Sequence, residues 1–280
     1  MHQRYEIVQK LGKGAYGIVW RAKDKKTRQT VALKKIFDAF QNATDAQRTY
    51  REVIYLQFLE GHENIISLQQ VLRADSDRDI YLVFDYMETD LHAAIRANIL
   101  EPAHERYIMY QAFKALMYIH SAGLVHRDLK PANLLLNAEC LMKLADFGLC
   151  RSLSELSRVA DEGSHLTDYV TTQWYRAPEI LLASKKYRET VDLWSLGCIF
   201  AEMLQGKPMF AGTSTLNQLE RVIEKIGFPN DDEQKAIETP FSKTMLDNLR
   251  TGPDSARKEW STLLPKADAD ATNLLSRLIA

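Results

Sequence analysis

The stretch His126-Arg127-Asp128-Leu129-Lys130-Pro131-Ala132-Asn133 packs acidic, basic and amide side chains into eight positions directly after an apolar run. Asp128 can accept a proton from a hydroxyl group, and Lys130 can neutralise charge on a phosphoryl group that is being transferred. Asn133 offers an amide oxygen to Mg²⁺, a hard cation that prefers oxygen ligands. The stretch therefore predicts a catalytic loop. The alternative is a structural loop with two helix caps.

A second acidic motif, Asp146-Phe147-Gly148, follows the first after a short interval. Its aspartate can supply a carboxylate to a metal ion, and its glycine allows the chain to turn. A purely structural loop would explain the first stretch but none of the other motifs. The two stretches together therefore favour a metal-assisted reaction.

A glycine-rich run, Gly12-Lys13-Gly14-Ala15-Tyr16-Gly17, lies between two strand-like segments. Glycines let backbone N–H groups approach phosphate oxygens closely. The run has neither the following helix of a dinucleotide-binding fingerprint nor the Gly-Lys-Ser/Thr of a Walker loop. By itself it could equally be the turn of a hairpin.

The residues Val31-Ala32-Leu33-Lys34 lie on the next strand-like run, and Glu52 lies on the following helix with apolar residues around it. A buried carboxylate needs a cationic partner, so we expect Lys34 to pair with Glu52 and to be held where it can grip nucleotide phosphates. A lone lysine in solvent is the alternative, and we expect that position for the adjacent Lys35.

Periodicity predicts two parts of different character. Strand-like runs cover residues 5–11, 18–22, 30–36, 65–73 and 80–84, and a helix covers residues 46–59. After Asp85 helical patterns dominate, including one through Ile108 and Ile119 and a buried one over residues 193–204. Residues 151–165 have no clear period and predict a mobile loop. We expect an α+β, two-lobed fold with an N-lobe at about 1–84, a hinge at 85–88 and a mainly helical C-lobe at 89–280.

Composition restricts the class of protein further. The chain has 280 residues, a net charge of −1, 46% hydrophobic and 26% charged residues. Near neutrality gives no global electrostatic argument for nucleic acid or a membrane surface. Cys140, Cys150 and Cys198 lie at no metal-ligand spacing and cannot pair completely, which favours a reducing, intracellular setting.

The motifs resemble those of eukaryotic-type protein kinases, in the same order and spacing from about Tyr5 to the last residue. This resemblance implies that Lys34 and Glu52 form an ion pair, that Asp128 with Lys130 is catalytic, and that Asn133 and Asp146 bind Mg²⁺. Ala177-Pro178-Glu179 would close the activation segment, and Asp192 would anchor the catalytic loop. Phe84 would guard the back of the adenine pocket. The residues implied to surround ATP are Leu11, Gly12, Gly14, Gly17, Val19, Ala32, Lys34, Asp85 and Met87.

Lys130 and Thr172 resemble the serine/threonine kinases, and Thr172 is expected to bridge Asp128 and Lys130. The triplet Thr167-Asp168-Tyr169, followed by Trp174-Tyr175-Arg176, is similar to the dual phosphorylation site of mitogen-activated protein kinases. Residues 79–84 and 212–216 are most similar to the atypical group of mitogen-activated protein kinase 15. The arginines implied to contact the two phosphates are Arg51, Arg127, Arg151 and Arg176. Arg176 would also favour proline after the target residue.

Two departures from the family pattern stand out. Gln173 occupies a position where the typical family has arginine, so one charge-assisted partner of the phosphotyrosine is lost. The chain also stops at Ala280, before further helices of the family, so we expect an incomplete C-lobe. His104 and Tyr107 match positions of the family's docking groove, or are simply solvated helix residues.

Three functions remain to be compared: an active serine/threonine kinase, a pseudokinase scaffold, and a cyclin-dependent kinase. The lysine, base and metal aspartate are all present, which argues against a pseudokinase. The helix at residues 49–52 lacks a cyclin-binding motif. The resemblance implies ATP and Mg²⁺ as cofactors and protein substrates and docking-motif proteins as partners. It also implies a monomer with no nucleic acid and no membrane insertion, in the cytoplasm, with the nucleus or cytoskeleton as further possibilities.

Overall fold

The computed structural model describes residues 4–14, 17–74, 76, 78–161, 172–184, 188–237, 239, 242–249 and 256–279, with residues 159–161 described by their backbone alone. The chain divides into two compact units. The first unit extends to Asp90 and also contains Leu134–Cys150. The second consists of Leu91–Asn133 and the residues from Arg151 onward.

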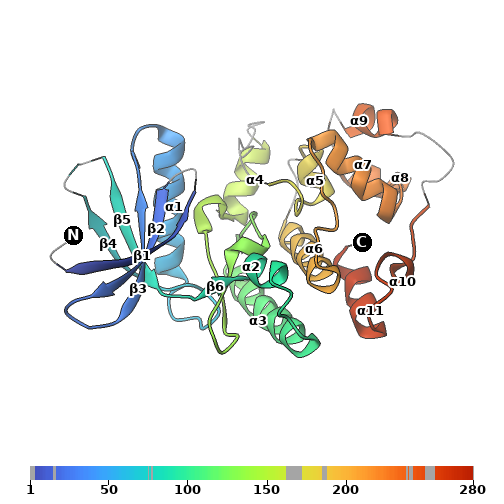
Figure 1. Ribbon diagram of the computed structural model, residues 1–280. Helices are drawn as coiled ribbons and strands as arrows, with labels where there is room; N and C mark the ends of the chain where they lie inside the picture. Colours follow the sequence, from blue (N-terminus) through green and yellow to red (C-terminus); the bar gives the residue numbers. More distant parts are fainter. Residues whose placement is uncertain are drawn as a thin grey trace. The chain divides into compact units, whose positions relative to one another are not determined.

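An antiparallel sheet of five strands forms the body of the first unit, in the order β1-β2-β3-β5-β4 (Figure 1). The aromatic and β-branched runs of the sequence supply these strands, as expected for a pleated, half-buried surface. Only the fourth strand begins later than predicted. The strands are β1 (Tyr5–Lys13), β2 (Gly17–Asp24), β3 (Thr30–Ile36), β4 (Leu68–Arg73) and β5 (Ile80–Asp85).

The two faces of this sheet differ in composition. Val31 and Leu33 of β3 are buried against Tyr5, Ala22 and Val83, which form an apolar cluster. Because side chains alternate along a strand, the intervening residues of β3 point to the opposite face. That second face is the one that carries Lys34.

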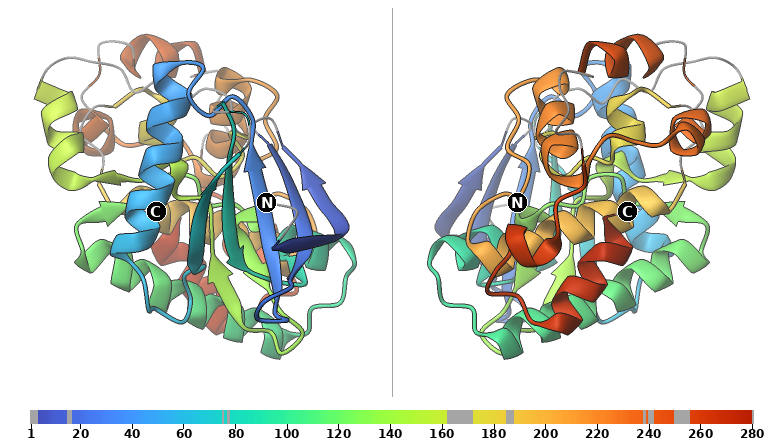
Figure 2. Two further views of the ribbon diagram at one scale, coloured as in Figure 1. Left: turned by 90° about the vertical axis from the view of Figure 1, so that its left-hand side faces the viewer. Right: turned by 90° about the vertical axis from the view of Figure 1, so that its right-hand side faces the viewer.

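Helix α1 (Ala43–Phe58) accompanies the sheet, and the left view of Figure 2 shows it running beside the strands. Asn42 caps the helix, its side chain accepting the N–H of Asp45. The helix buries Thr49, Glu52 and Leu56 on one face, at intervals of three and four residues that match the helical period. The predicted helix over residues 46–59 is therefore confirmed with an earlier start.

A smaller sheet completes the first unit. Its strands β6 (Thr89–Asp90), β8 (Leu134–Leu136) and β9 (Met142–Leu144) pair in the order β6-β8-β9. The short helix η2 (Phe147–Leu149) follows and lies against α1. Asn64, in the segment between α1 and β4, binds this sheet by donating from Nδ2 to the carbonyl of Met142 in β9 at 3.0 Å.

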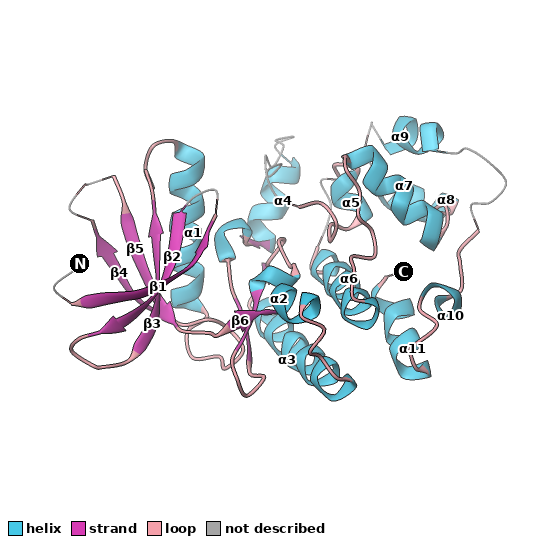
Figure 3. Ribbon diagram, in the orientation of Figure 1, coloured by secondary structure: helices cyan, strands magenta, loops and turns pink. Residues whose placement is uncertain are grey.

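The second unit is mainly helical, as Figure 3 shows by the dominance of cyan over magenta in this part of the chain. This result confirms the predicted fold class. Two short strands, β7 (Leu124–Val125) and β10 (Arg151–Ser152), pair antiparallel within it. Its helices are α2 (Leu91–Arg96), α3 (Pro102–Ser121), η1 (Pro131–Asn133), α4 (Leu153–Asp161), α5 (Pro178–Leu181), α6 (Thr190–Gln205), α7 (Thr215–Ile226), α8 (Asp231–Ile237), α9 (Ser242–Leu249), α10 (Trp260–Leu263) and α11 (Ala269–Leu278).

Helix α6 is the core of the second unit. Most of its residues from Val191 to Met203 are buried, and α3 and α11 both contact it. Gly197 allows the close approach of α11, because a Cβ atom there would lie 2.7 Å from a side-chain carbon of Ile279. The helix ends at Gly206, whose φ of 75° gives the left-handed cap that glycine adopts without strain.

The loop expected over residues 151–165 is wrong where the structure describes it. Arg151 and Ser152 form β10, and a helix follows over Leu153–Asp161. Leu156 is buried, and the hydroxyl of Ser152 accepts the N–H of Glu155 at the start of the helix. The serine at position 152, a residue type that favours helix starts, and the leucines at positions 153 and 156 could have predicted this helix. Across the described residues, no helix combines the length and apolar character needed to cross a membrane.

Candidate active site

A buried carboxylate holds the loop that contains Asp128. Asp192 of α6 is fully buried, and its two oxygens accept the backbone N–H groups of His126 and Arg127, each at 2.8 Å. His120 Nε2 lies 2.9 Å from Asp192 Oδ2. Three polar partners satisfy this carboxylate, so its burial is compatible with a stable fold. Arg127 adopts a φ of 69°, and the hydrogen bond from its N–H secures that conformation.

Asp128, Lys130 and Asn133 meet within this loop. Lys130 Nζ donates to Asp128 Oδ2 at 2.6 Å, and Asn133 Nδ2 donates to the carbonyl of Asp128 at 2.8 Å. Asp128 is only 7% exposed. Because the amide nitrogen of Asn133 is directed at Asp128, its amide oxygen is the atom that remains for a cation. The donor set therefore fits Mg²⁺, which favours oxygen ligands.

The expected bridge through Thr172 is not formed. Lys130 reaches Asp128 directly, and no hydrogen bond joins Thr172 to either of these two described residues. Thr172 itself is exposed. A direct charge-assisted bond at 2.6 Å leaves little for a neutral hydroxyl to add.

Lys34 and Glu52 form an ion pair within the first unit. Lys34 Nζ lies 2.7 Å from Glu52 Oε1 and 2.9 Å from Oε2. The lysine side chain is 25% exposed and the glutamate side chain 6% exposed. Burial lowers the pKa of the Lys34 ammonium, but Glu52 and Asp146 outweigh this effect, so the pKa lies above its usual range. The ammonium thus keeps its charge and can bind phosphate oxygens.

The sheet register aligns the predicted nucleotide residues in one row. Val19 of β2 is opposite Gly12 of β1 on one side and opposite Lys34 of β3 on the other. A Cβ atom on Gly12 or Gly14 would meet nothing within 4 Å, so open space adjoins both backbones. Gly17 differs, because a Cβ there would lie 2.0 Å from the carbonyl oxygen of Lys35. Gly17 therefore serves strand packing.

The residues predicted to surround adenine lie at the end of β5 and on β3. Ala32 is opposite Phe84, which is buried, and both point to the same face as Lys34. The N–H of Asp85 donates to the carbonyl of Ser67 at 3.3 Å, and Asp85 is opposite Val31 of β3. Met87 is 9% exposed, and Leu11 is 41% exposed on β1.

Asp146, the second predicted metal ligand, lies in the first unit next to Arg48 of α1. Arg48 Nη2 lies 3.5 Å from Asp146 Oδ2, and Asp146 has a left-handed φ of 64°. The side chain of Arg48 also covers Gly148 so closely that a Cβ there would lie 2.7 Å from Arg48 Cγ. Sequence reasoning missed Arg48. Its spacing of four residues before Glu52 was the available signal.

Thr167 and Tyr169, the predicted phosphorylation sites, lie outside the described residues. Of the four arginines predicted to contact the phosphates, Arg151 is the most buried, and its Nε lies 3.3 Å from Glu155 Oε1. Arg151 is opposite Val125 in the β7–β10 pair, two residues from Arg127. Arg51 is half-buried on α1, and the N–H of Arg176 donates to the carbonyl of Gln173.

Two surface predictions need correction. Lys35 does not simply face solvent, because its Nζ lies 2.7 Å from Asp79 Oδ2 and over the rings of Phe37 and Tyr81. His104 is not simply solvated, because its Nδ1 accepts the N–H of Glu101 in a capping box that begins α3, and its place in a docking groove stays a prediction. Local backbone satisfaction decides the position of His104.

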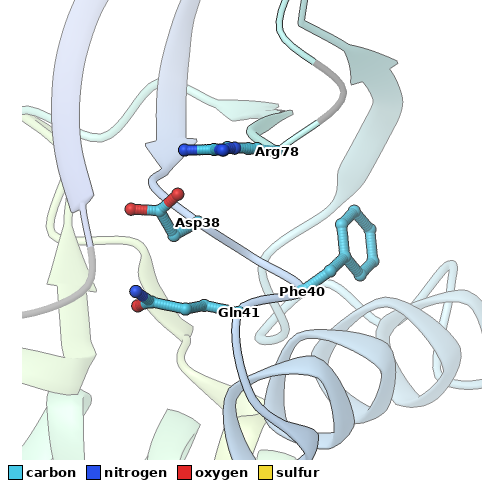
Figure 4. Close-up of a pocket in the computed structure, with 4 residues that line it drawn as sticks. All are labelled: Asp38, Phe40, Gln41 and Arg78. Carbon is cyan, nitrogen blue, oxygen red and sulfur yellow. The ribbon is translucent and has the colours of Figure 1, made fainter.

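A hollow of about 380 Å³ opens elsewhere in the first unit, between the segment after β3 and the one before β5. Figure 4 shows the polar ends of Asp38, Gln41 and Arg78 gathered on one side, with the ring of Phe40 apart. None of the predicted nucleotide residues lines it. It is therefore distinct from the row of Gly12, Val19 and Lys34.

The sequence profile of the protein kinase domain matches residues 5–279. Extracellular signal-regulated kinase 2 of Dictyostelium discoideum is 60% identical over 277 residues, covering 99% of this chain and 74% of that protein. Mitogen-activated protein kinase 15 of Caenorhabditis elegans is 49% identical over 282 residues, covering 100% of this chain and 59% of that protein. Mitogen-activated protein kinase 15 of Xenopus laevis is 51% identical, and the chain covers 47% of it.

The chain therefore belongs to the protein kinase family and, within it, to the mitogen-activated protein kinases. The predicted resemblance and the predicted enzyme class are confirmed at this level. A protein kinase domain binds ATP and acts on protein substrates. The chain spans about half to three quarters of the length of these relatives.

Proposed function

We propose that this domain transfers the γ-phosphate of ATP to serine or threonine hydroxyl groups of protein substrates. The observation that carries the proposal is the pairing of Asp128 with Lys130 and Asn133 on a loop anchored by Asp192. This arrangement presents one carboxylate, one ammonium group and one amide oxygen from a single rigid loop. Positioning and electrostatic stabilisation of this kind provide most of the catalysis in phosphoryl transfer.

In the proposed reaction the substrate hydroxyl oxygen forms a bond to the γ-phosphorus, and the bond to the leaving ADP oxygen breaks. The hydroxyl proton passes to a carboxylate oxygen of Asp128. Lys130 neutralises charge on the transferred group, and Lys34, held by Glu52, orients the nucleotide phosphates. Asn133 and Asp146 are the residues that would hold Mg²⁺, which would supply positive charge near the phosphate oxygens.

We further propose that the enzyme is proline-directed and is activated by phosphorylation of Thr167 and Tyr169. Arg51, Arg127 and Arg151 would bind phosphothreonine, which carries a charge of about −1.5 to −2. The segment that ends in Arg176 would read the residue after the phosphoacceptor. We also propose that the chain divides into an N-lobe at about 1–84, a hinge at 85–88 and a C-lobe at 89–280. We also propose a monomer inside the cell with docking-motif partners.

Purified protein, ATP–Mg²⁺ and a peptide library centred on serine or threonine test this proposal, with products identified by mass spectrometry. We expect phosphorylated serine and threonine, enriched in proline at the next position. Asp146→Ala serves as the inactive control. Transfer without any proline preference would refute the specificity, and no transfer by a folded wild type phosphorylated on Thr167 and Tyr169 would refute the activity. Phosphate on Thr167 and Tyr169 in the wild type alone would establish autoactivation. Phosphate in neither protein would indicate that an upstream kinase is required.

A further inference from the structure

Gln173 and Trp174, which precede Ala177, are tied to α7 and the loop before it by side-chain hydrogen bonds. Gln218 is fully buried, and its amide oxygen accepts the N–H of Gly212 at 2.9 Å while its amide nitrogen donates to the carbonyl of Trp174 at 3.3 Å. Trp174 Nε1 donates in return to the carbonyl of Gly212 at 2.9 Å. This network holds Trp174 against the loop before α7.

Gly212, in the loop before α7, packs closely against that helix. A Cβ atom on Gly212 would lie 2.5 Å from the Cα of Gln218, so only glycine fits. The helix itself begins with Ser214, whose hydroxyl accepts the N–H of Asn217 at 3.2 Å. Thr215 therefore occupies a fixed place in the first turn.

Thr215 extends this contact to Gln173. Thr215 Oγ1 donates to Gln173 Oε1 at 3.0 Å, and both side chains are partly buried. The carbonyl of Gln173 accepts the N–H of Arg176 at 3.0 Å, which closes a turn over Gln173–Arg176. The side chain of Gln173 thus connects that turn to α7. Both partners are neutral, so the bond needs no phosphate and no charged ligand.

We propose that Gln173 and Thr215 are a pair of positioning residues that holds the Gln173–Arg176 turn in its substrate-reading conformation without phosphorylation. The inference rests on the proposed function, because the turn matters for peptide binding only if the domain phosphorylates proteins. A neutral hydrogen bond contributes modestly to stability, whereas a carboxamide cannot replace the charge-assisted contact that arginine makes with phosphate. The pair therefore acts on peptide binding and turn order, and leaves the chemical step unchanged.

Hydrogen–deuterium exchange of the phosphatase-treated, full 280-residue chain provides a test that is independent of activity. Thr215→Val removes the donor at nearly constant shape, Thr215→Ser retains it, and Gln173→Met removes the acceptor. Thr213→Val is the matched control, because Thr213 is exposed and its hydroxyl bonds to Asn217 in the first turn of α7 and not to the Gln173–Arg176 turn. We expect the peptide covering residues 173–177 to exchange about threefold to tenfold faster in Thr215→Val and Gln173→Met, as loss of one neutral hydrogen bond implies.

The double variant Gln173→Met/Thr215→Val should exchange no faster than either single variant, since the two changes remove the same bond. In kinetic assays Thr215→Val should raise the KM for a Ser-Pro peptide about threefold to tenfold, while kcat and the KM for ATP remain unchanged. Equal exchange in Thr215→Val and Thr215→Ser, or fully additive effects in the double variant, would overturn the pairing. A wild type that is inactive even when phosphorylated on Thr167 and Tyr169 would instead refute the proposed function, and the exchange data would still decide the pairing.

Discussion

Asp192 and His126 lie 66 residues apart, yet the carboxylate of Asp192 accepts the backbone N–H of His126 at 2.8 Å inside the second unit. The same carboxylate accepts the N–H of Arg127. A buried helix residue thus fixes the backbone one residue before Asp128. The geometry of the proposed base depends on a side chain that touches no reacting atom.

Replacing Asp192 tests this dependence. Asp192→Ala leaves two backbone N–H groups without their acceptors, at a cost of about 1–3 kcal/mol each in stability. We expect a lower Tm and a loss of kcat of at least about 10²-fold, since misplacing a catalytic group by 1 Å has such effects. Asp192→Asn keeps one acceptor oxygen and should lose less stability. Glu189→Gln, at the start of the same helix, is the control and should behave as wild type in both measurements.

The ion pair of Lys34 and Glu52 leads to a kinetic prediction. Lys34→Met should lower kcat/KM for ATP by about 10²–10³-fold, the usual effect of removing one group that stabilises charge in a transition state. Glu52→Gln should lower kcat/KM less, because the ammonium group of Lys34 remains but loses the ion pair that positions it. The double variant should be no worse than Lys34→Met alone. Lys35→Met breaks the Asp79 pair and should leave kcat/KM unchanged, and a loss equal to that of Lys34→Met would argue against a specific role for Lys34.

The three glycines of the glycine-rich run should respond differently to alanine. In Gly17→Ala the new Cβ overlaps the carbonyl oxygen of Lys35, and such overpacking costs about 1–3 kcal/mol, so Tm should fall. In Gly12→Ala and Gly14→Ala the added atom meets open space, so Tm should hold while the KM for ATP rises. Calorimetry and initial-rate kinetics measure the two effects. A fall in Tm as large in Gly14→Ala as in Gly17→Ala would refute this division of roles.

Glu202 predicts how stability depends on pH. Burial raises the pKa of its carboxyl above the usual 4.5, although the Tyr175 hydroxyl, which donates to it at 2.7 Å, opposes the shift. The folded state therefore binds this proton more tightly than the unfolded state. The stabilising contribution is complete below about pH 4.5 and is lost as the pH rises through the folded pKa.

Glu202→Gln keeps an acceptor for Tyr175 and removes the ionisation. We expect its Tm to exceed that of wild type at pH 8, with the difference shrinking towards pH 4.5. Glu220→Gln, an exposed glutamate of α7, is the control and should show no such trend. A Glu202→Gln protein less stable than wild type at pH 8 would contradict the assignment.

Much of the fold could be predicted from the sequence because local patterns and tertiary packing agree. The strand runs, the Glu52 helix and the buried helix of α6 all follow from hydrophobic periodicity. The helix over Leu153–Asp161 was missed, since its polar composition hides a short apolar repeat. Glycine spacing likewise could not show that Gly17 packs against Lys35 while Gly12 and Gly14 adjoin open space.

The candidate site was harder to predict in its supporting contacts. Residue type identified Asp128, Lys130 and Asn133, but the direct bond between the first two replaced the expected bridge through Thr172. The pairing of Gln173 with Thr215 joins residues 42 apart and could not be read from either position alone. Contacts of this kind depend on how helices pack and not on any local pattern.

Transfer of labelled γ-phosphate from ATP–Mg²⁺ to a protein rich in Ser-Pro and Thr-Pro tests the proposed kinase activity most directly. Wild type and Asp128→Asn are compared at equal concentration, after their Tm values have been shown to be the same. We expect label on serine and threonine with wild type. The rate of labelling should be at least about 10²-fold lower with Asp128→Asn, which is the contribution expected of a general base. Equal labelling by the two proteins, or none by a folded wild type that is phosphorylated on Thr167 and Tyr169, would contradict the proposed kinase activity.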